Sequence, residues 1–494
     1  RRLAWQESRS PAFALDGVLE VYRSGLAFAL TGAQERVLSE IAGDIQSPRP
    51  MARLLQGDVG SGKTAVAGAA LVIAAANGYQ GALMAPTEIL AEQHYRTLTN
   101  LLGGLVIRGP QDERKNLRIE LLTRSMSNKA KREVVEAVAC GEVDVMVGTH
   151  ALIQESVSFQ RLGIAVVDEQ HRFGVMQRAA LRERVTNGED GQHAGLKPGA
   201  SNGTAPASGF NPSATEAPHL LVMSATPIPR TLALTFFGDL DASVIDEMPP
   251  GRLPVETHWV APDERAEAYG FVREQIGQGR QVFVVCPLIE ESAALQTRSA
   301  TQEYERLSHE VFPELRLGLL HGRMASKDKD AVLAAFRRGD LDILVATTVI
   351  EVGIDIPNAT VMVIEGADRF GLAQLHQLRG RVGRGADQSF CLLLSDDPSE
   401  LARQRLQLLE ELNDGFALAE ADLRLRGPGD YFGTRQSGLP EFHAADFSDL
   451  KLIETARQEA MSLLKEDPGL RRTEHALLAA AVAKTKRTVI GDAS

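Results

Sequence analysis

Short apolar runs alternate with helical stretches along most of this chain of 494 residues. The first set of runs lies at 51–55, 81–85, 143–147, 164–167 and 220–223, and the second at 282–285, 343–346, 361–364 and 390–394. Runs that are continuously apolar and separated by helices are typical of parallel strands buried on both faces. Two such sets predict an α/β protein with two parallel-sheet domains.

The segments between these runs predict the domain limits. Residues 249–251 read Pro-Pro-Gly, which disfavours helix and strand alike, so we place the join there. Residues 186–218 are rich in Gly, Ser, Ala, Pro, Asn and Thr, which predicts a disordered insertion in the first domain. Beyond about residue 400 the pattern becomes helical, at 401–412 and 450–464, around a Gly- and Arg-rich loop at 424–438.

A phosphate-binding loop is the strongest chemical signal. The first apolar run leads into a G-x-x-x-x-G-K-T segment made of Gly57, Asp58, Val59, Gly60, Ser61, Gly62, Lys63 and Thr64. An alanine-rich helical stretch at 65–76 follows, so the order is strand, Gly-rich loop and helix. In such a loop the backbone N–H groups and the helix dipole bind phosphate. We expect Lys63 to reach the β- and γ-phosphates of ATP, and the Thr64 hydroxyl to ligate Mg²⁺.

Two carboxylates end the strand predicted at 164–167. Asp168 and Glu169 follow it directly, and the carboxyl edge of a parallel sheet is where ligands bind. In isolation such a strand end is usually a solvated turn. Combined with the phosphate loop, it predicts that Asp168 holds Mg²⁺ and that Glu169 positions or activates the attacking water.

Composition excludes few partners. The formal net charge is −12, so nucleic acid is not held by bulk charge, although a local basic groove stays possible. Cys140, Cys286 and Cys391 are far apart and are expected to be reduced core residues. No apolar run reaches 18 residues and no signal peptide opens the chain, so we expect a cytoplasmic protein without membrane contact.

The carboxylates continue as Asp168-Glu169-Gln170-His171, and here the sequence resembles the superfamily 2 helicases, whose second motif has this form. Further segments resemble other motifs of that superfamily in its order: 28–34, 85–88, 147–150, 224–227, 347–355 and 377–384. Each match alone is weak, but the set covers about 350 residues.

The resemblance implies roles for individual residues. It assigns contacts with adenine and the rest of the nucleotide to Gln34, Gly353 and Asp355. Coupling of hydrolysis to domain movement falls to Gln170, His171, Ser224 and Thr226. Contacts with the nucleic acid backbone fall to Pro86, Thr87, Thr149, His150 and Thr348. Arg381 and Arg384 would be arginine fingers that meet the γ-phosphate across a cleft between the domains.

Longer segments resemble the RecG family, the bacterial branch-migration translocases. These segments are 168–175, 223–232 and 374–384; transcription-repair coupling factor carries similar ones, but 284–292 and 422–430 favour RecG. The resemblance implies RecA-like domains at 31–250 and 251–400, and a region at 401–494 with a helical hairpin and a loop. Its translocation motif would contact duplex DNA through Arg424, Arg426, Arg435 and Gln436.

Three departures from the family pattern bear on function. The family places a wedge domain ahead of the motor, and residues 1–30 resemble only the remnant of its linker helix, which puts fork-specific unwinding in doubt. Arg124 stands where the family usually has glycine in a loop that touches DNA, so it is a further candidate phosphate contact. The insertion at 186–218 has no assigned role, and we expect ATP hydrolysis to survive its deletion.

The resulting hypothesis is an enzyme that uses ATP and Mg²⁺ to move on branched double-stranded DNA, such as stalled forks and Holliday junctions. A related duplex translocase or an RNA helicase is an alternative, since backbone contacts alone do not separate DNA from RNA. A nucleotide-gated clamp without turnover is a third. We expect a monomer, and the resemblance alone suggests a single-stranded-DNA-binding protein as a partner.

Overall fold

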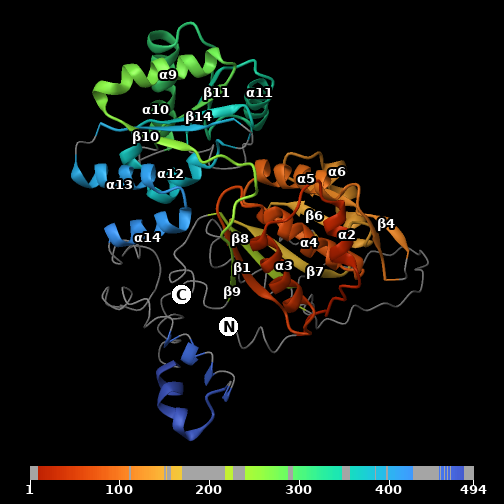
Figure 1. The fold of residues 1–494 in the computed structure, drawn as a ribbon. Helices are drawn as coiled ribbons and strands as arrows, with labels where there is room; N and C mark the ends of the chain where they lie inside the picture. The colour runs from red at the N-terminus through yellow and green to blue at the C-terminus, as the bar shows by residue number, and fades with distance from the viewer. Residues whose placement is uncertain are drawn as a thin grey trace, which may run out of the picture. The chain divides into compact units, whose positions relative to one another are not determined.

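The computed structural model describes residues 9–110, 113–149, 152, 157–169, 217–225, 240–287, 293–347, 356–383, 385, 387–396, 399–426 and parts of 455–482. It divides into two compact units, with one division between Gly251 and Arg252. Each unit contains one parallel sheet with helices, as Figure 1 shows, which confirms the predicted fold class.

The first sheet has seven strands in the order β5-β6-β2-β7-β8-β1-β9, and every described pairing is parallel. The strands are β1 (Ala52–Gly57), β2 (Gln80–Met84), β5 (Ile119–Leu122), β6 (Val145–Gly148), β7 (Leu162–Asp168), β8 (His219–Ser224) and β9 (Asp241–Ile245). A separate antiparallel pair joins β3 (Val106–Arg108) to β4 (Arg114–Asn116).

Helices cover both faces of this sheet, and alternate residues of each strand therefore enter different cores. The helices are α2 (Val18–Gly25), α3 (Gly32–Ile45), α4 (Lys63–Ala76), α5 (Glu88–Leu102) and α6 (Asn128–Ala139). Leu83 of β2 lies in the core formed with α2 to α5, whereas its neighbour Met84 lies in the core formed with α6. Twelve of the fourteen residues of α4 are buried, which explains its alanine-rich sequence.

Among the described residues, the second sheet has six strands, all parallel, in the order β10-β15-β14-β11-β13-β12. The strands are β10 (Glu256–Val260), β11 (Gln281–Val285), β12 (Leu317–Leu320), β13 (Ile343–Ala346), β14 (Ala359–Ile364) and β15 (Phe390–Leu394). Its helices are α9 (Arg265–Gly277), α10 (Ala293–Arg306), α11 (Ser326–Arg337), α12 (Leu372–Arg379), α13 (Glu400–Glu411) and α14 (Gly415–Arg426).

The C-terminal expectation needs one correction. Arg424 and Arg426 were assigned to a loop, but both lie at the end of α14. The helix forms because Leu418 and Ala419 are buried on it, and α14 packs against α12 and α13. The loop at 427–438 lies wholly outside the described residues. The insertion expected at 186–218 lies outside them except for Ala217 and Pro218, and the helix expected at 450–464 is described only in part.

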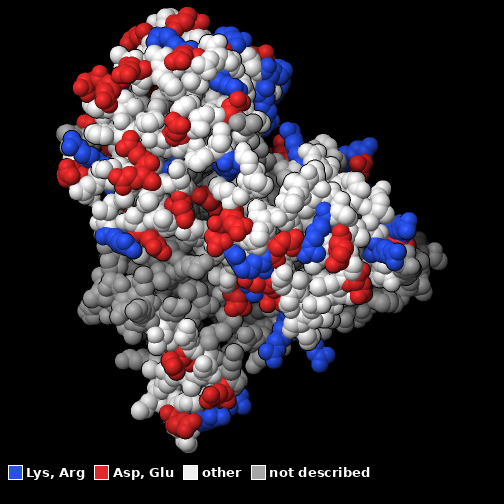
Figure 2. All heavy atoms as spheres, in the orientation of Figure 1, with Lys and Arg blue, Asp and Glu red and all other residues white. Residues whose placement is uncertain are grey.

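Surface charge is mixed over the described part. Basic and acidic side chains are interspersed on the face drawn in Figure 2, in keeping with the net charge of −12. Among the described residues, no helix combines the length and apolar character needed to cross a bilayer.

The core of the second unit offers a stability test. Phe283 of β11 is fully buried, and its ring centroid lies 5.2 Å from the ring centroid of Phe336 on α11. Phe283→Ala is expected to lower the free energy of unfolding of this unit by about 3–5 kcal/mol, because it removes apolar contacts and leaves a cavity. Urea unfolding measures the loss, and hydrogen exchange localises it to β11 and β14. Leu401→Ala, at a side chain that is 57% exposed, is the control, and an equal effect of both would contradict the assigned core.

Candidate nucleotide-binding site

The phosphate loop lies between β1 and α4. Gly60 and Gly62 have φ values of 84° and 82°, a conformation that glycine adopts without the strain that a Cβ would cause. Gly62 immediately precedes the first residue of α4, Lys63. The first N–H groups of a helix lack helical acceptors, so this tight turn ends on a set of backbone donors with a positive dipole end. The arrangement suits a phosphate group.

Lys63 lies across the loop. Its Nζ donates to the carbonyl oxygens of Gly57 at 2.8 Å and Asp58 at 2.9 Å. The Asp58 carboxylate in turn accepts a hydrogen bond from the N–H of Val59 at 2.7 Å. The loop therefore holds an ammonium group beside the start of α4, where it can meet an anion.

Gln34 ties α3 to this loop. Its Oε1 accepts from the N–H of Thr31 at 2.9 Å, and its Nε2 donates to the carbonyl of Ser61 at 2.8 Å. Thr31 caps α3 reciprocally through its hydroxyl, so the pair forms a capping box. Gln34 is only 2% exposed. The predicted adenine contact stays a prediction, and the structure adds a role in fixing the loop.

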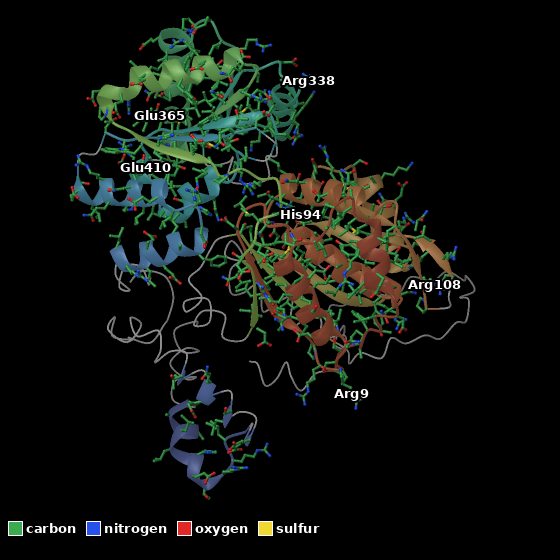
Figure 3. The ribbon with its side chains drawn as sticks, viewed as in Figure 1. Arg9, His94, Arg108, Arg338, Glu365 and Glu410 are labelled. Carbon is green, nitrogen blue, oxygen red and sulfur yellow. The ribbon has the colours of Figure 1, made fainter. Side chains whose placement is uncertain are left out.

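Asp168 is the last residue of β7 and is 8% exposed. His94 of α5, labelled in Figure 3, lies with its Nε2 2.7 Å from Asp168 Oδ2. Burial raises the pKa of Asp168, but the hydrogen bond with His94 and the charges of His94 and Lys63 outweigh it and lower the pKa below its ordinary value. The carboxylate is therefore ionised at neutral pH and lies within the electrostatic reach of the phosphate loop.

Glu169 follows with an unusual backbone. Its φ is 51°, in the left-handed region that a non-glycine residue seldom occupies. Its N–H donates to the carbonyl of Met223 at 3.0 Å, which joins the end of β7 to the end of β8. Such strain costs about 1–3 kcal/mol and is concentrated at functional sites.

Other predicted residues lie at the same edge of the sheet. Ser224 ends β8 and Thr149 follows β6, and both are buried. Pro86 and Thr87 follow β2, and the Thr87 hydroxyl caps α5 by accepting from the N–H of Leu90. Arg124 follows β5, and its N–H donates to Glu88 Oε1 at 2.9 Å.

The second unit contains Arg381, which is 8% exposed and follows α12. Its neighbour Arg379 has a structural role that the sequence did not indicate. Arg379 donates to the carbonyl oxygens of Leu409, Leu412 and Asn413 at 2.7, 2.9 and 3.1 Å. These groups end α13, so Arg379 caps that helix and joins it to the predicted arginine-finger segment.

Several predicted site residues lie outside the described residues: His150, Gln170, His171, Thr226, Thr348, Gly353, Asp355, Arg384, Arg435 and Gln436. The side chain of Arg426 also lies outside them, whereas Arg424 is described on α14. Their assigned roles stay predictions.

His94 is the functional-site residue that sequence reasoning missed. It stands in the buried stripe of α5 with Leu90, Ala91, Leu98 and Leu102. A histidine among apolar positions three and four residues apart is the signal that could have drawn attention to it. The pattern does not reveal its partner, because Asp168 is 74 residues further along the chain.

Family comparisons agree with the motifs. A model of DEAD/DEAH box helicases matches residues 31–235, and a model of the helicase conserved C-terminal domain matches residues 267–386. These matches and the two parallel-sheet units place the chain among the superfamily 2 helicases. A third model, ATP-dependent DNA helicase RecG domain 3, C-terminal, matches residues 412–494. The chain belongs to the RecG family.

Individual relatives support this assignment. ATP-dependent DNA helicase RecG from Synechocystis sp. is 50% identical over 467 residues, which is 94% of this chain and 51% of the relative. The Bacillus subtilis RecG is 50% identical over 454 residues, 92% of this chain and 61% of the relative. A solved structure of RecG bound to a three-way DNA junction is 43% identical, with a TM-score of 0.69, over 92% of this chain and 55% of that one. This chain thus spans about half to three fifths of its relatives.

The conformation of Gly62 can be tested directly. A Cβ at this position would lie 2.3 Å from Gln34 Nε2, and φ is 82°, so Gly62→Ala is expected to distort the loop. The affinity for ATP should fall at least about tenfold, since 1.4 kcal/mol of lost binding suffices. Gly43→Ala is the control, because Gly43 lies in α3 with open space around it and should leave affinity unchanged. Fluorescent-nucleotide binding makes the comparison; equal affinities for both variants would refute the phosphate-loop assignment.

Proposed function

We propose that this chain is an ATP-dependent translocase and helicase that acts on branched double-stranded DNA, such as stalled replication forks and Holliday junctions. The observation that carries the proposal is the combination of two features of one chain. The first unit has a phosphate loop and a buried Asp168 that contacts His94 at 2.7 Å, and the C-terminal region matches a RecG model. A relative that is 43% identical was solved with a three-way DNA junction.

The described residues fit a magnesium nucleotide. Asp168 offers an ionised carboxylate, and Thr64, the second residue of α4, offers a hydroxyl beside Lys63. Oxygen ligands of this kind are those that Mg²⁺ prefers. When bound, Mg²⁺ would neutralise charge on the phosphate oxygens.

In the proposed reaction Lys63 binds the β- and γ-phosphates, and Glu169 orients the attacking water toward the γ-phosphorus. Arg381 and Arg384 of the second unit stabilise the negative charge that develops on the γ-phosphoryl oxygens. An arginine finger contributes about 10³–10⁵ in rate, so hydrolysis would require the two units to close on the nucleotide. Gln170, His171, Ser224 and Thr226 would pass the change of nucleotide state to the second unit.

DNA would be contacted through its phosphates, which fits remodelling that does not depend on sequence. The candidate contacts of the first unit are Pro86, Thr87, Arg124, Thr149 and His150. Those of the second are Thr348, Arg424, Arg426, Arg435 and Gln436. The RecG-type match at 412–494 favours duplex DNA over RNA. A single-stranded-DNA-binding partner and a monomeric state stay predictions.

Substrate class is tested by comparing DNA forks, Holliday junctions and RNA duplexes in ATP-dependent unwinding assays with this chain. We expect both branched DNA substrates to be processed and RNA not to be. Faster unwinding of RNA would support the RNA-helicase alternative, whereas nucleotide binding without any phosphate release would support a clamp.

Removing the lysine charge tests the chemical step. Lys63→Ala is expected to abolish phosphate release, a loss of at least about 100-fold, because no other described group would replace the ammonium in the loop. Forked-DNA affinity should stay within about threefold. Lys129→Ala, at an exposed lysine of α6 that pairs with Glu133, is the matched control and should hydrolyse normally. Retained turnover in Lys63→Ala would refute the assignment.

A second variant separates hydrolysis from movement. Arg435→Ala is expected to keep most DNA-stimulated phosphate release but to stop branch migration, because it removes one charged contact with the duplex and none with the nucleotide. A strand-exchange assay on a labelled Holliday junction gives the readout. Unchanged branch migration would exclude Arg435 from the translocation mechanism.

A further inference from the structure

Helix α5 connects two parts of the first unit that the proposed function treats separately. Thr87, a candidate DNA contact, is its N-cap, and His94 lies seven residues later. Seven residues are about two turns of helix, so both positions lie on nearly the same face, about 10 Å apart. The buried stripe of Leu90, Ala91, His94, Leu98 and Leu102 packs the helix onto β5, β6 and α4. A helix packed along its length is a rigid element, so a displacement of its start would be transmitted to His94.

At one end of this face, His94 contacts Asp168. The Nε2 to Oδ2 distance is 2.7 Å, and the two side chains are 10% and 11% exposed. An ionised carboxylate can only accept, so the imidazole donates from Nε2. A hydrogen bond to a charged, water-excluded acceptor is stronger and more directional than an exposed one. The bond therefore fixes the rotation of the Asp168 carboxylate and the direction in which its other oxygen points.

At the other end, α5 is joined to a second candidate DNA contact. Glu88, the first residue of α5, accepts from the N–H of Arg124 at 2.9 Å. Lys131 of α6 donates to the carbonyl of Arg124 at 2.8 Å, and the hydroxyls of Thr123 and Ser125 lie 2.9 Å apart. Binding of DNA phosphates at Thr87 and Arg124 would thus displace the start of α5.

We propose that His94 is a positioning residue through which DNA contact at the start of α5 sets the orientation of the Asp168 carboxylate. The inference rests on the proposed function, since it needs the chain to bind DNA and to hydrolyse ATP. It adds a described route within the first unit, from Thr87, Glu88 and Arg124 along α5 to the carboxylate. DNA stimulation of hydrolysis then includes a component that is transmitted within the first unit.

Thermodynamic linkage supplies a readout that does not depend on turnover. If DNA and magnesium nucleotide both favour the same placement of α5, the binding of each must change the affinity of the chain for the other by the same factor. The factor is measured as the ratio of dissociation constants of labelled forked DNA with and without adenylyl imidodiphosphate and Mg²⁺. Couplings of this kind are typically about 5–150-fold.

The test compares three variants at α5. His94→Leu removes the donor, His94→Gln keeps an amide donor, and Thr97→Ala changes an exposed residue of the same helix. We expect His94→Leu to reduce the linkage factor and the DNA stimulation of phosphate release at least about fivefold. His94→Gln should recover part of both, and Thr97→Ala should match the unmodified chain. DNA affinity without nucleotide should stay within about twofold in all three.

The outcomes separate the inference from the function on which it rests. A His94→Leu variant that keeps the full linkage factor overturns the inference. An equal loss of hydrolysis with and without DNA also overturns it, because that result indicates a role confined to the nucleotide site. Failure of DNA to stimulate the unmodified chain overturns the proposed function instead. If His94→Leu does not fold, Glu88→Ala gives the same test from the start of α5. It is expected to lower the linkage factor, and an unchanged factor overturns the inference.

Discussion

Parallel strands all end at the same edge of a sheet, and the site in the first unit depends on this constraint. Four described strands, β1, β2, β7 and β8, are paired in parallel. Their ends carry Gly57 of the phosphate loop, the segment before Thr87, Asp168 and Ser224. Residues separated by more than a hundred positions are thereby brought to one edge. The burial of both faces keeps this edge rigid, because no strand can slip without exposing one of two cores.

Hydrogen bonds between buried polar groups then fix the site within that edge. Gln34 holds the phosphate loop from α3, and His94 holds Asp168 from α5. Each bond lies where water is excluded, so losing one partner leaves a desolvated group and costs about 1–3 kcal/mol. The strained backbone of Glu169 is held by the same surroundings. Binding groups positioned in advance lose less entropy when a ligand arrives.

The sequence predicts the features that depend on local pattern. Continuous apolar runs predicted nine of the strands, and the glycines of the phosphate loop predicted its turn, since Gly60 and Gly62 have positive φ. Long-range partners could not be predicted. The stripe of α5 shows that His94 is buried but not that Asp168 accepts its hydrogen bond. Arg379 was considered only with the arginine-finger segment, yet its guanidinium caps α13 through three carbonyl groups.

The local sequence pattern did not predict two edge strands, and it gave the wrong structure for a segment of mixed composition. β9 and β10 are edge strands with exposed positions, so their apolar runs are interrupted. The segment of α14 carries arginines close to glycines, which favoured a loop, but the burial of Leu418 and Ala419 against α12 and α13 stabilises a helix up to Arg426. Tertiary packing thus overrode local composition, as it does wherever an apolar face finds a partner.

The central proposal is that both units bind one triphosphate, with Lys63 of the first unit and the predicted arginine fingers of the second. Spin labels at Thr97→Cys and Arg337→Cys, in a Cys140→Ser background, report the distance between exposed sites of the two units, because Cys286 and Cys391 are buried. Double electron–electron resonance should show a shifted and narrower distance distribution with adenylyl imidodiphosphate, Mg²⁺ and forked DNA than without them. An identical distribution in both conditions would contradict the account.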